Sequence, residues 1–145
     1  MSEEFNLARF TEAQAPVYDT VVAELRAARK RTHWMWFIFP QIAGLGRSAT
    51  AQHYAIDSLA QAQAYLAHPV LGARLRECTS LVAAAQERSA HQIFGDPDDM
   101  KLHSSLTLFA RAAPAEPLFL DCLAKYFNGE PDPATLSLLD QGDPV

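Results

Sequence analysis

The chain has 145 residues, of which 49% are hydrophobic and 20% charged, and this balance is typical of one globular domain, not of a disordered or fibrous protein. Its longest apolar run, Trp34–Phe39, is far shorter than the roughly 20 residues of a membrane-spanning helix. The chain begins Met-Ser-Glu-Glu, which is acidic where a signal peptide would be basic. We therefore expect a cytoplasmic protein that does not associate with membranes.

Prolines and helix-capping residues divide the chain into short helical segments. Each segment carries apolar residues at spacings of three and four, and most begin at a proline or at a Ser, Asn or Asp that can cap a helix. The segments span residues 6–14, 16–28, 48–56, 58–67, 69–85, 89–94, 96–113, 117–128 and 132–139. Two of the starts, Ser58 with Gln61 and Ser89 with Gln92, also match the capping-box pattern.

The run Trp34–Phe39 fits either a buried strand or a buried helix. A strand needs a partner, and the sequence offers no second strand-like run. A helix, or an irregular apolar segment that ends at Pro40, is therefore favoured, with strand pairing across a dimer as the alternative. The sequence as a whole predicts an all-α fold. Residues 1–140 would form a single compact domain of about seven to eight short helices, and residues 141–145 a frayed tail.

Charge is distributed unevenly along the chain. The formal net charge of −5 disfavours binding to nucleic acid or to an anionic membrane. However, no acidic residue lies between Glu24 and Asp57, a window that contains both tryptophans. Five of the twelve basic residues lie in this window: Arg26, Arg29, Lys30, Arg31 and Arg47. A local positive field in an acidic protein indicates a small anionic ligand as the partner.

The first candidate site is the segment Arg29–Trp34. Arginine, lysine and a protonated His33 can all donate hydrogen bonds to an anion, and the neighbouring aromatic rings can stack on a base. A structural explanation is equally concrete. Basic residues at the C-terminal end of the preceding helix would compensate its dipole, and the tryptophans would belong to the core.

The second candidate site is Gln41–Ser48, which contains two glycines and leads into a predicted helix. Gly44 and Gly46 would let backbone N–H groups approach a phosphate, and Arg47 can bind it through two hydrogen bonds. Ser48 would cap the helix, whose N-terminus favours anions. The spacing does not match that of a Walker loop, and short glycine-rich turns into helices also occur without a ligand.

The third candidate site is Asp98–Ser105. On a helix Lys101, Ser104 and Ser105 would share one face, where a serine and a lysine can act as nucleophile and base. Asp99 would serve as a general acid or base if it is desolvated. The alternative is that the aspartates cap the helix, Lys101 pairs with Asp98 and the serines permit a close helix crossing.

The histidines and cysteines have no spacing typical of metal ligands, so we expect neither a metal nor another cofactor. Cys78 and Cys122 fall within predicted helices and are expected to be thiols of the core.

Seven motifs together resemble those of a bacterial family known as domain of unknown function 1810. They are Lys30–Gln41, Gly44–Ser48, Tyr54–Ile56, Ala64–Leu66, His68–Gly72, Ile93–Gly95 and Lys101–Phe109. The resemblance extends over nearly the whole chain and implies a small helical domain, but it implies no activity. Members of this family are sometimes labelled calpastatin, whose repeats are disordered, whereas this chain has the composition of a folded protein.

A second, shorter pattern is similar to helical glycosidases that act on ADP-ribose-like N-glycosides. It consists of Gln52–Tyr54 and of Lys101 in a helix that ends at Phe109, and it lacks the C-terminal signature of those enzymes, which is rich in Trp and Gly. This similarity implies a class of ligand and assigns no catalytic residue.

Two hypotheses follow. In the first, the protein binds a phosphorylated or nucleotide-like ligand, and if it is an enzyme it is an N-glycosidase-like hydrolase. The ligand-binding residues would be Lys30, Arg31, Trp34, Trp36, Gln41, Gly44, Gly46, Arg47, Ser48, His53, Tyr54, Ser104 and Ser105, and the catalytic residues His33, Asp99 and Lys101. In the second, an exposed Trp34–Phe39 run docks on another protein or forms a homodimer, without catalysis.

Overall fold

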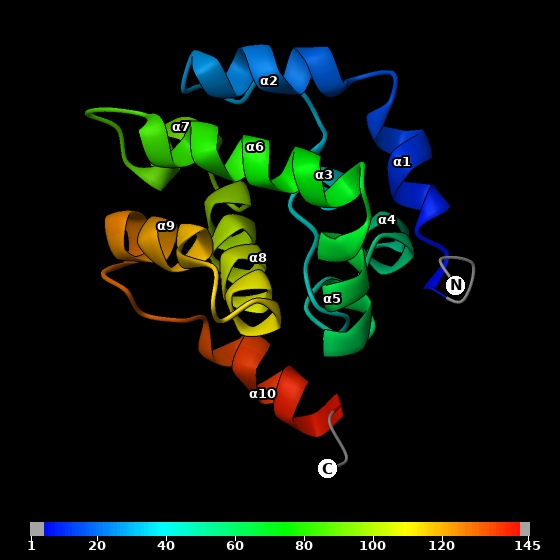
Figure 1. Ribbon diagram of the computed structural model, residues 1–145. Helices are drawn as coiled ribbons and strands as arrows, with labels where there is room; N and C mark the ends of the chain where they lie inside the picture. Colours follow the sequence, from blue (N-terminus) through cyan, green and yellow to red (C-terminus); the bar gives the residue numbers. More distant parts are fainter. Residues whose placement is uncertain (1–4, 143–145) are drawn as a thin grey trace.

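Residues 5–142, which the computed structural model describes, form ten α-helices joined by short loops (Figure 1). The helices are α1 (Ala8–Gln14), α2 (Tyr18–Arg26), α3 (Met35–Ile38), α4 (Ala49–His53), α5 (Leu59–Ala67), α6 (Leu71–Ala84), α7 (Ala90–Phe94), α8 (Asp98–Ala112), α9 (Pro117–Phe127) and α10 (Pro133–Gly142). Seven of them have seven or more residues, and the other three are one-turn helices. Within this range the one β-type contact is an isolated parallel bridge between Ile42 and Ile56. The predicted all-α fold is confirmed.

The central element is α8, which packs against α5, α7, α9 and α10 and runs through the middle of the molecule in Figure 1. Every residue from Ser104 to Ala110 is buried, so this helix is enclosed on all sides, as expected of a core helix. Phe109 contacts the rings of Tyr65 on α5 and Phe119 on α9. The core thus joins the helices of both halves of the chain in one compact domain.

The run Trp34–Phe39 belongs to this core. It forms the short helix α3, and Trp34, Met35, Ile38 and Phe39 are each about 1% exposed. Trp36 and Phe37 are half-buried. The helical interpretation of this run was therefore right. The exposed aromatic patch on which the interaction-module hypothesis depended is not formed.

Some predicted helix starts are confirmed and others are wrong. Ser89 and Gln92 form the complete capping box, and Ser48 caps α4. At Ser58 only half of the box forms, because the side-chain oxygen of Gln61 accepts instead from Arg9 and from the backbone N–H of Asp57.

Two other helices begin without the side-chain cap that we expected. α1 begins at Ala8, after Leu7, and α8 begins at Asp98, after Pro97. Neither Leu7 nor Pro97 has a side-chain oxygen that could cap the helix, and Asn6, with φ of +50°, lies outside the cap position.

Three predicted helix ends also shift. α2 stops at Arg26, because Ala28 adopts a left-handed conformation with φ of +56°. α4 stops at His53, because the chain then turns to pair Ile56 with Ile42. α10 continues to Gly142, beyond the predicted end at residue 139. Residues 143–145, the last part of the predicted frayed tail, lie outside the described residues. None of the helices described in residues 5–142 is long and apolar enough to cross a membrane.

Gly72, in the first turn of α6, lies against the last turn of α5. A Cβ atom at this position would be 2.1 Å from the carbonyl oxygen of Leu66 and 2.9 Å from its carbonyl carbon. The same carbonyl accepts a hydrogen bond from Nη1 of Arg76 at 3.1 Å. Glycine is therefore required here by the close approach of another backbone segment, although it costs about 1 kcal/mol of helix propensity relative to alanine.

We predict that Gly72→Ala destabilises the protein, although the same change stabilises most helix interiors. The methyl group can be accommodated only if the backbone at Leu66 moves, which should cost about 1–3 kcal/mol and lower Tm by several degrees. Thermal denaturation measures this effect, with Ser80→Ala at an exposed position of α6 as the control. A Gly72→Ala protein that melts at or above the wild-type temperature would contradict the close contact.

Candidate functional site

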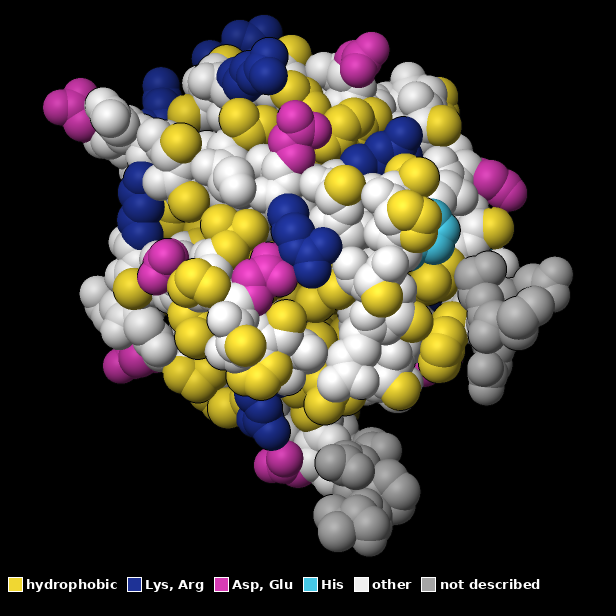
Figure 2. Space-filling view, in the orientation of Figure 1, with side chains coloured by type: hydrophobic (Ala, Val, Ile, Leu, Met, Phe, Trp, Pro, Cys, Tyr) yellow, Lys and Arg dark blue, Asp and Glu magenta, His cyan; other side chains and the backbone are white. Residues whose placement is uncertain are grey.

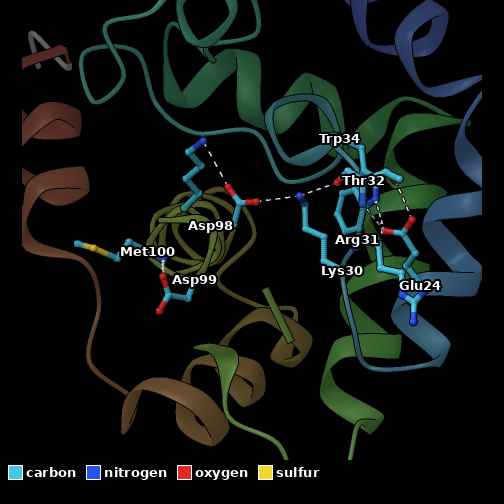
Figure 3. A network of polar contacts seen from close by, with 9 residues as sticks. Glu24, Lys30, Arg31, Thr32, Trp34, Asp98, Asp99 and Met100 are labelled. Carbon is cyan, nitrogen blue, oxygen red and sulfur yellow. Dashed lines mark hydrogen bonds and ion pairs between the residues drawn. The ribbon is translucent and has the colours of Figure 1, made fainter. Parts of the chain in front are cut away.

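Glu24, on α2, holds the loop that leads to α3 (Figure 3). Its Oε1 atom accepts hydrogen bonds from the backbone N–H of Arg31 at 2.8 Å and of Thr32 at 3.1 Å. The same oxygen accepts from Nε1 of Trp34 at 2.9 Å, and Oε2 accepts from Oγ1 of Thr32 at 2.7 Å. One carboxylate thus fixes the backbone of the loop and the indole ring of a buried tryptophan.

These hydrogen bonds also determine the charge state of Glu24. Burial alone would raise the pKa of the carboxyl, since only 8% of the residue is exposed. The hydrogen bonds from Arg31, Thr32 and Trp34 favour the charged form and outweigh burial, so the pKa of Glu24 lies below its ordinary value. The residue is therefore ionised at neutral pH, and both of its oxygens are directed at the loop.

Lys30 turns into the protein and ties the loop to α7 and α8. Its Nζ atom lies 2.8 Å from Oδ2 of Asp98, and 7% of the side chain is exposed. Nζ also donates to the carbonyl of Thr32 at 2.6 Å and lies 5.1 Å from the centre of the Trp34 ring. The backbone N–H of Lys30 donates to the carbonyl of Ile93 at 2.7 Å. The loop is thus anchored by Glu24 on one side and by Asp98 on the other.

Asp98 brings together the first and third predicted sites. In addition to Lys30, it pairs with Lys101, whose Nζ lies 3.4 Å from Oδ1. That ammonium also lies 4.7 Å from the centre of the Trp36 ring. Both lysines therefore have a carboxylate partner within the protein, and their charge is less available to a ligand than the sequence suggested.

Arg29 and Arg31, on either side of Lys30 in the chain, are exposed. Lys30, by contrast, is directed into the protein toward Asp98. In Figure 3 Lys30 extends toward Asp98, whereas Arg31 extends on the other side, next to Glu24. An inward-directed lysine thus lies between two exposed arginines.

The two arginines line a surface hollow of about 520 Å³ together with a third, Arg88, from the loop between α6 and α7. We call it the arginine hollow. Its lining residues are Thr20, Ala23, Glu24, Ala27, Arg29, Arg31 and Arg88. Within residues 5–142, none of the three guanidinium groups has a hydrogen-bond or ion-pair partner. In Figure 2 Lys and Arg side chains gather at the top of the molecule, over α2.

The glycine-rich loop Gln41–Ser48 is explained by packing. Gly44 has φ of +105°, and a Cβ atom there would be 3.0 Å from the side chain of Leu138 on α10. A Cβ atom at Gly46 would be 2.4 Å from that of Ala51 on α4. The carbonyl of Gln41 accepts from the backbone N–H of Ile56. The contacts of this loop are thus with α4, α10 and the segment after α4, and none of its residues lines the arginine hollow.

Arg47 and Ser48 stand apart from the other predicted anion-binding residues. Ser48 caps α4 by accepting from the backbone N–H of Ala51. Arg47 is exposed, and its carbonyl accepts from Nε2 of Gln52. Neither residue lies next to the Lys30–Asp98 pair or lines the arginine hollow.

The polar side chains of α8 form hydrogen bonds with the backbone of α8 itself, with α7 and with the residue just before α10. Asp99 accepts from the backbone N–H of Met100, and its other oxygen is 3.3 Å from Nδ1 of His91. Ser104 donates to Asp132 at 3.0 Å, so the expected pairing with Lys101 does not form. Ser105 is fully buried, and its hydroxyl lacks a partner among the described residues.

The remaining candidates are dispersed. His33 is exposed in the loop before α3. His53 contacts the ring of Tyr54 edge-on, and Tyr54 in turn packs against Phe10 and Phe37. His53 and Tyr54 therefore lie at the end of α4, next to α1 and α3, and away from the arginine hollow.

Both cysteines are buried, as predicted. Burial raises the pKa of Cys78 and Cys122 to about 12 in each case, so neither thiol is a nucleophile at neutral pH. Among the residues that the structure describes, no three His, Cys, Asp or Glu side chains gather where they could hold a metal ion.

Two charged residues of the hollow, Glu24 and Arg88, were not among the predicted site residues. Glu24 marks the start of the acid-free window, and its position one helical turn before a basic loop could have indicated a loop anchor. Arg88 follows Glu87 in a polar segment without any motif. Only the folded structure places it beside Arg29 and Arg31.

The chain is similar to a known protein family and to a solved crystal structure. The profile of the family described as "Protein of unknown function (DUF1810)" matches residues 4–139. The structure is also similar to the crystal structure of the conserved hypothetical protein Rv1873 from Mycobacterium tuberculosis, with 59% sequence identity and a TM-score of 0.93 over 94% of this chain and 98% of that one. No curated protein matches the chain.

We predict that Glu24→Gln lowers the free energy of unfolding because the loop loses its acceptor, and that the loss depends on pH as expected of a carboxylate. The new side chain would place an NH₂ group against the loop donors, which should lower the free energy of unfolding by about 1–3 kcal/mol at neutral pH. Because the folded pKa of Glu24 is lowered, its contribution is complete above the ordinary glutamate pKa of about 4.3 and is lost as the pH falls through the folded pKa.

The difference between wild type and Glu24→Gln should therefore be constant from about pH 7 to 5 and shrink below about pH 4. Denaturant unfolding at several pH values measures it. Glu12→Gln, an exposed glutamate on α1, serves as the control and should change the free energy by less than about 0.5 kcal/mol. An equal effect of the two substitutions would show that Glu24 does not hold the loop.

Proposed function

We propose that this chain, which belongs to the DUF1810 family, binds a small phosphate-bearing ligand in the arginine hollow. The observation that carries the proposal is the arrangement of Arg29, Arg31 and Arg88 around one hollow of about 520 Å³. Guanidinium groups bind phosphate oxygens through paired, charge-assisted hydrogen bonds. The volume falls in the range of about 300–1,000 Å³ typical of small-molecule sites.

The electrostatics of the hollow support an anionic ligand. Glu24 is the one carboxylate among its lining residues, and its oxygens already accept four hydrogen bonds from the loop. It therefore does not bridge to the arginines as an exposed glutamate would. A phosphate-bearing ligand entering the hollow would provide acceptors for guanidinium groups that have no partner among residues 5–142.

Rigidity is a second supporting feature. Arg29 and Arg31 flank Lys30, whose side chain and backbone are bonded to α8 and α7. The backbone that presents the arginines is thus held before a ligand arrives, and less conformational entropy is lost on binding.

The proposal concerns binding and includes no reaction step. Hydrolysis would require a general acid or base beside the ligand, and the expected candidates His33, Asp99 and Lys101 do not line the hollow. Trp34 is about 1% exposed, and Trp36 lies under Lys101, so neither ring is free to stack on a base in the hollow. The nucleotide-hydrolase form of the ligand hypothesis therefore has less support than binding of phosphate groups alone.

We predict that Arg31→Ala weakens the binding of inorganic phosphate about tenfold or more, because each charge-assisted hydrogen bond contributes about 1.5–3 kcal/mol and 1.4 kcal/mol corresponds to a factor of ten. Titration calorimetry at constant ionic strength measures the dissociation constant. Tm should change little, since the Arg31 side chain is exposed and bonded to no described residue.

Arg47→Ala is the matched control, since Arg47 is another exposed arginine of the same basic window but lies outside the hollow. It should bind phosphate as wild type does. Loss of binding in Arg47→Ala with normal binding in Arg31→Ala would move the site to the loop before α4 and overturn the proposal.

A further inference from the structure

We infer that the arginine hollow recognises a diphosphate group, with Arg88 as the residue that selects it over a single phosphate. This inference rests on the proposed function and names the class of its ligand. It depends on where the three arginines come from in the fold and on what else lines the hollow.

The three guanidinium groups belong to two separate segments. Arg29 and Arg31 are two residues apart in the loop held by Glu24. Arg88 lies in the loop between α6 and α7, where Glu87 adopts a left-handed conformation with φ of +59°. The hollow lies between these segments. We therefore assign one phosphate group to the two arginines of the first loop and a second, linked phosphate group to Arg88 of the other loop.

The charge of the hollow fits the same anion. Three arginines and the ionised Glu24 leave an excess of two positive charges, that is, three minus one. One phosphate group carries about −1.5 to −2 at neutral pH, so the formal excess equals the charge of one phosphate group, and a diphosphate needs the full charge of the third arginine as well. Because Glu24 directs its oxygens at Arg31, Thr32 and Trp34, its charge is partly compensated there and weakens the positive field of the hollow less than its formal value suggests.

The uncharged lining of the hollow argues against a specific site for a nucleobase. It consists of Thr20, Ala23 and Ala27, which lie on one face of α2 and just beyond its end, and none of the lining residues is aromatic. Bases bound without pairing partners are usually stacked on aromatic side chains or arginine planes. Here the arginines are assigned to phosphate, and the methyl groups of the alanines offer only a shallow apolar contact. The diphosphate itself should therefore provide most of the affinity.

The test compares three ligands on three proteins. Titration calorimetry at constant ionic strength, with chelator to remove divalent cations, gives dissociation constants for inorganic phosphate, pyrophosphate and ADP. The proteins are wild type, Arg88→Ala and the control Arg111→Ala, which removes an exposed arginine of α8 outside the hollow. Circular dichroism and Tm confirm that each variant is folded.

Wild type and Arg111→Ala should bind pyrophosphate roughly tenfold or more tightly than phosphate, since Arg88 adds charge-assisted hydrogen bonds to the second phosphate group. In Arg88→Ala this preference should fall to less than about threefold, while the affinity for phosphate changes little. ADP should bind wild type within about threefold of pyrophosphate, because the base gains no aromatic partner.

Equal affinity of wild type for phosphate and pyrophosphate would overturn the diphosphate inference and leave the phosphate site intact. A preference that persists in Arg88→Ala would show that Arg88 does not select the ligand. ADP that binds tenfold more tightly than pyrophosphate would show that the base has its own site. Failure of both inorganic anions to bind wild type would instead overturn the proposed function itself.

Discussion

The buried carboxylate of Glu24 is the interaction on which the rest of the site depends. It accepts hydrogen bonds from two successive backbone N–H groups, a hydroxyl and an indole, so it converts a stretch rich in cations into a loop of defined shape. A carboxylate buried without partners would be strongly destabilising. Here its four donors stabilise the ionised form, and the loop gains an internal counter-charge that does not occupy the outward-facing arginines.

The basic residues of the loop face two different environments. Lys30 is directed inward, where it meets Asp98 and the ring of Trp34, and so connects the loop to the helices that form the core. Arg29 and Arg31 remain at the surface with Arg88. This arrangement explains how a chain with a net charge of −5 presents a local cluster of positive charge that no carboxylate of residues 5–142 pairs with. The acid-free window contains two arginines of this cluster, whereas Lys30 and Arg47 do not line the hollow.

Much of the fold could be predicted because its determinants are local. The capping box at Ser89 depends on residues three apart, and the prediction of α3 as a helix followed from the lack of any partner strand. Helix ends were harder, since α4 stops where Ile56 pairs with Ile42, a contact that local sequence does not encode. The site was harder still. Lys30 and Asp98 are far apart in the chain. Arg88 reaches the hollow only because α6 packs against α2 and α7 packs against α8, so periodicity and motifs could not bring these side chains together.

The most direct test of anion binding in the arginine hollow follows the arginine side chains themselves. In a titration of the ¹⁵N-labelled protein with pyrophosphate, the Nε–Hε resonances of Arg29, Arg31 and Arg88 should shift together and saturate at one dissociation constant. Those of Arg47 and Arg111 should stay in place. Such a result would establish one anion site at the arginine hollow. If Arg47 shifts and saturates while Arg31 does not move, the anion binds at the loop before α4, and the arginine hollow is not the binding site.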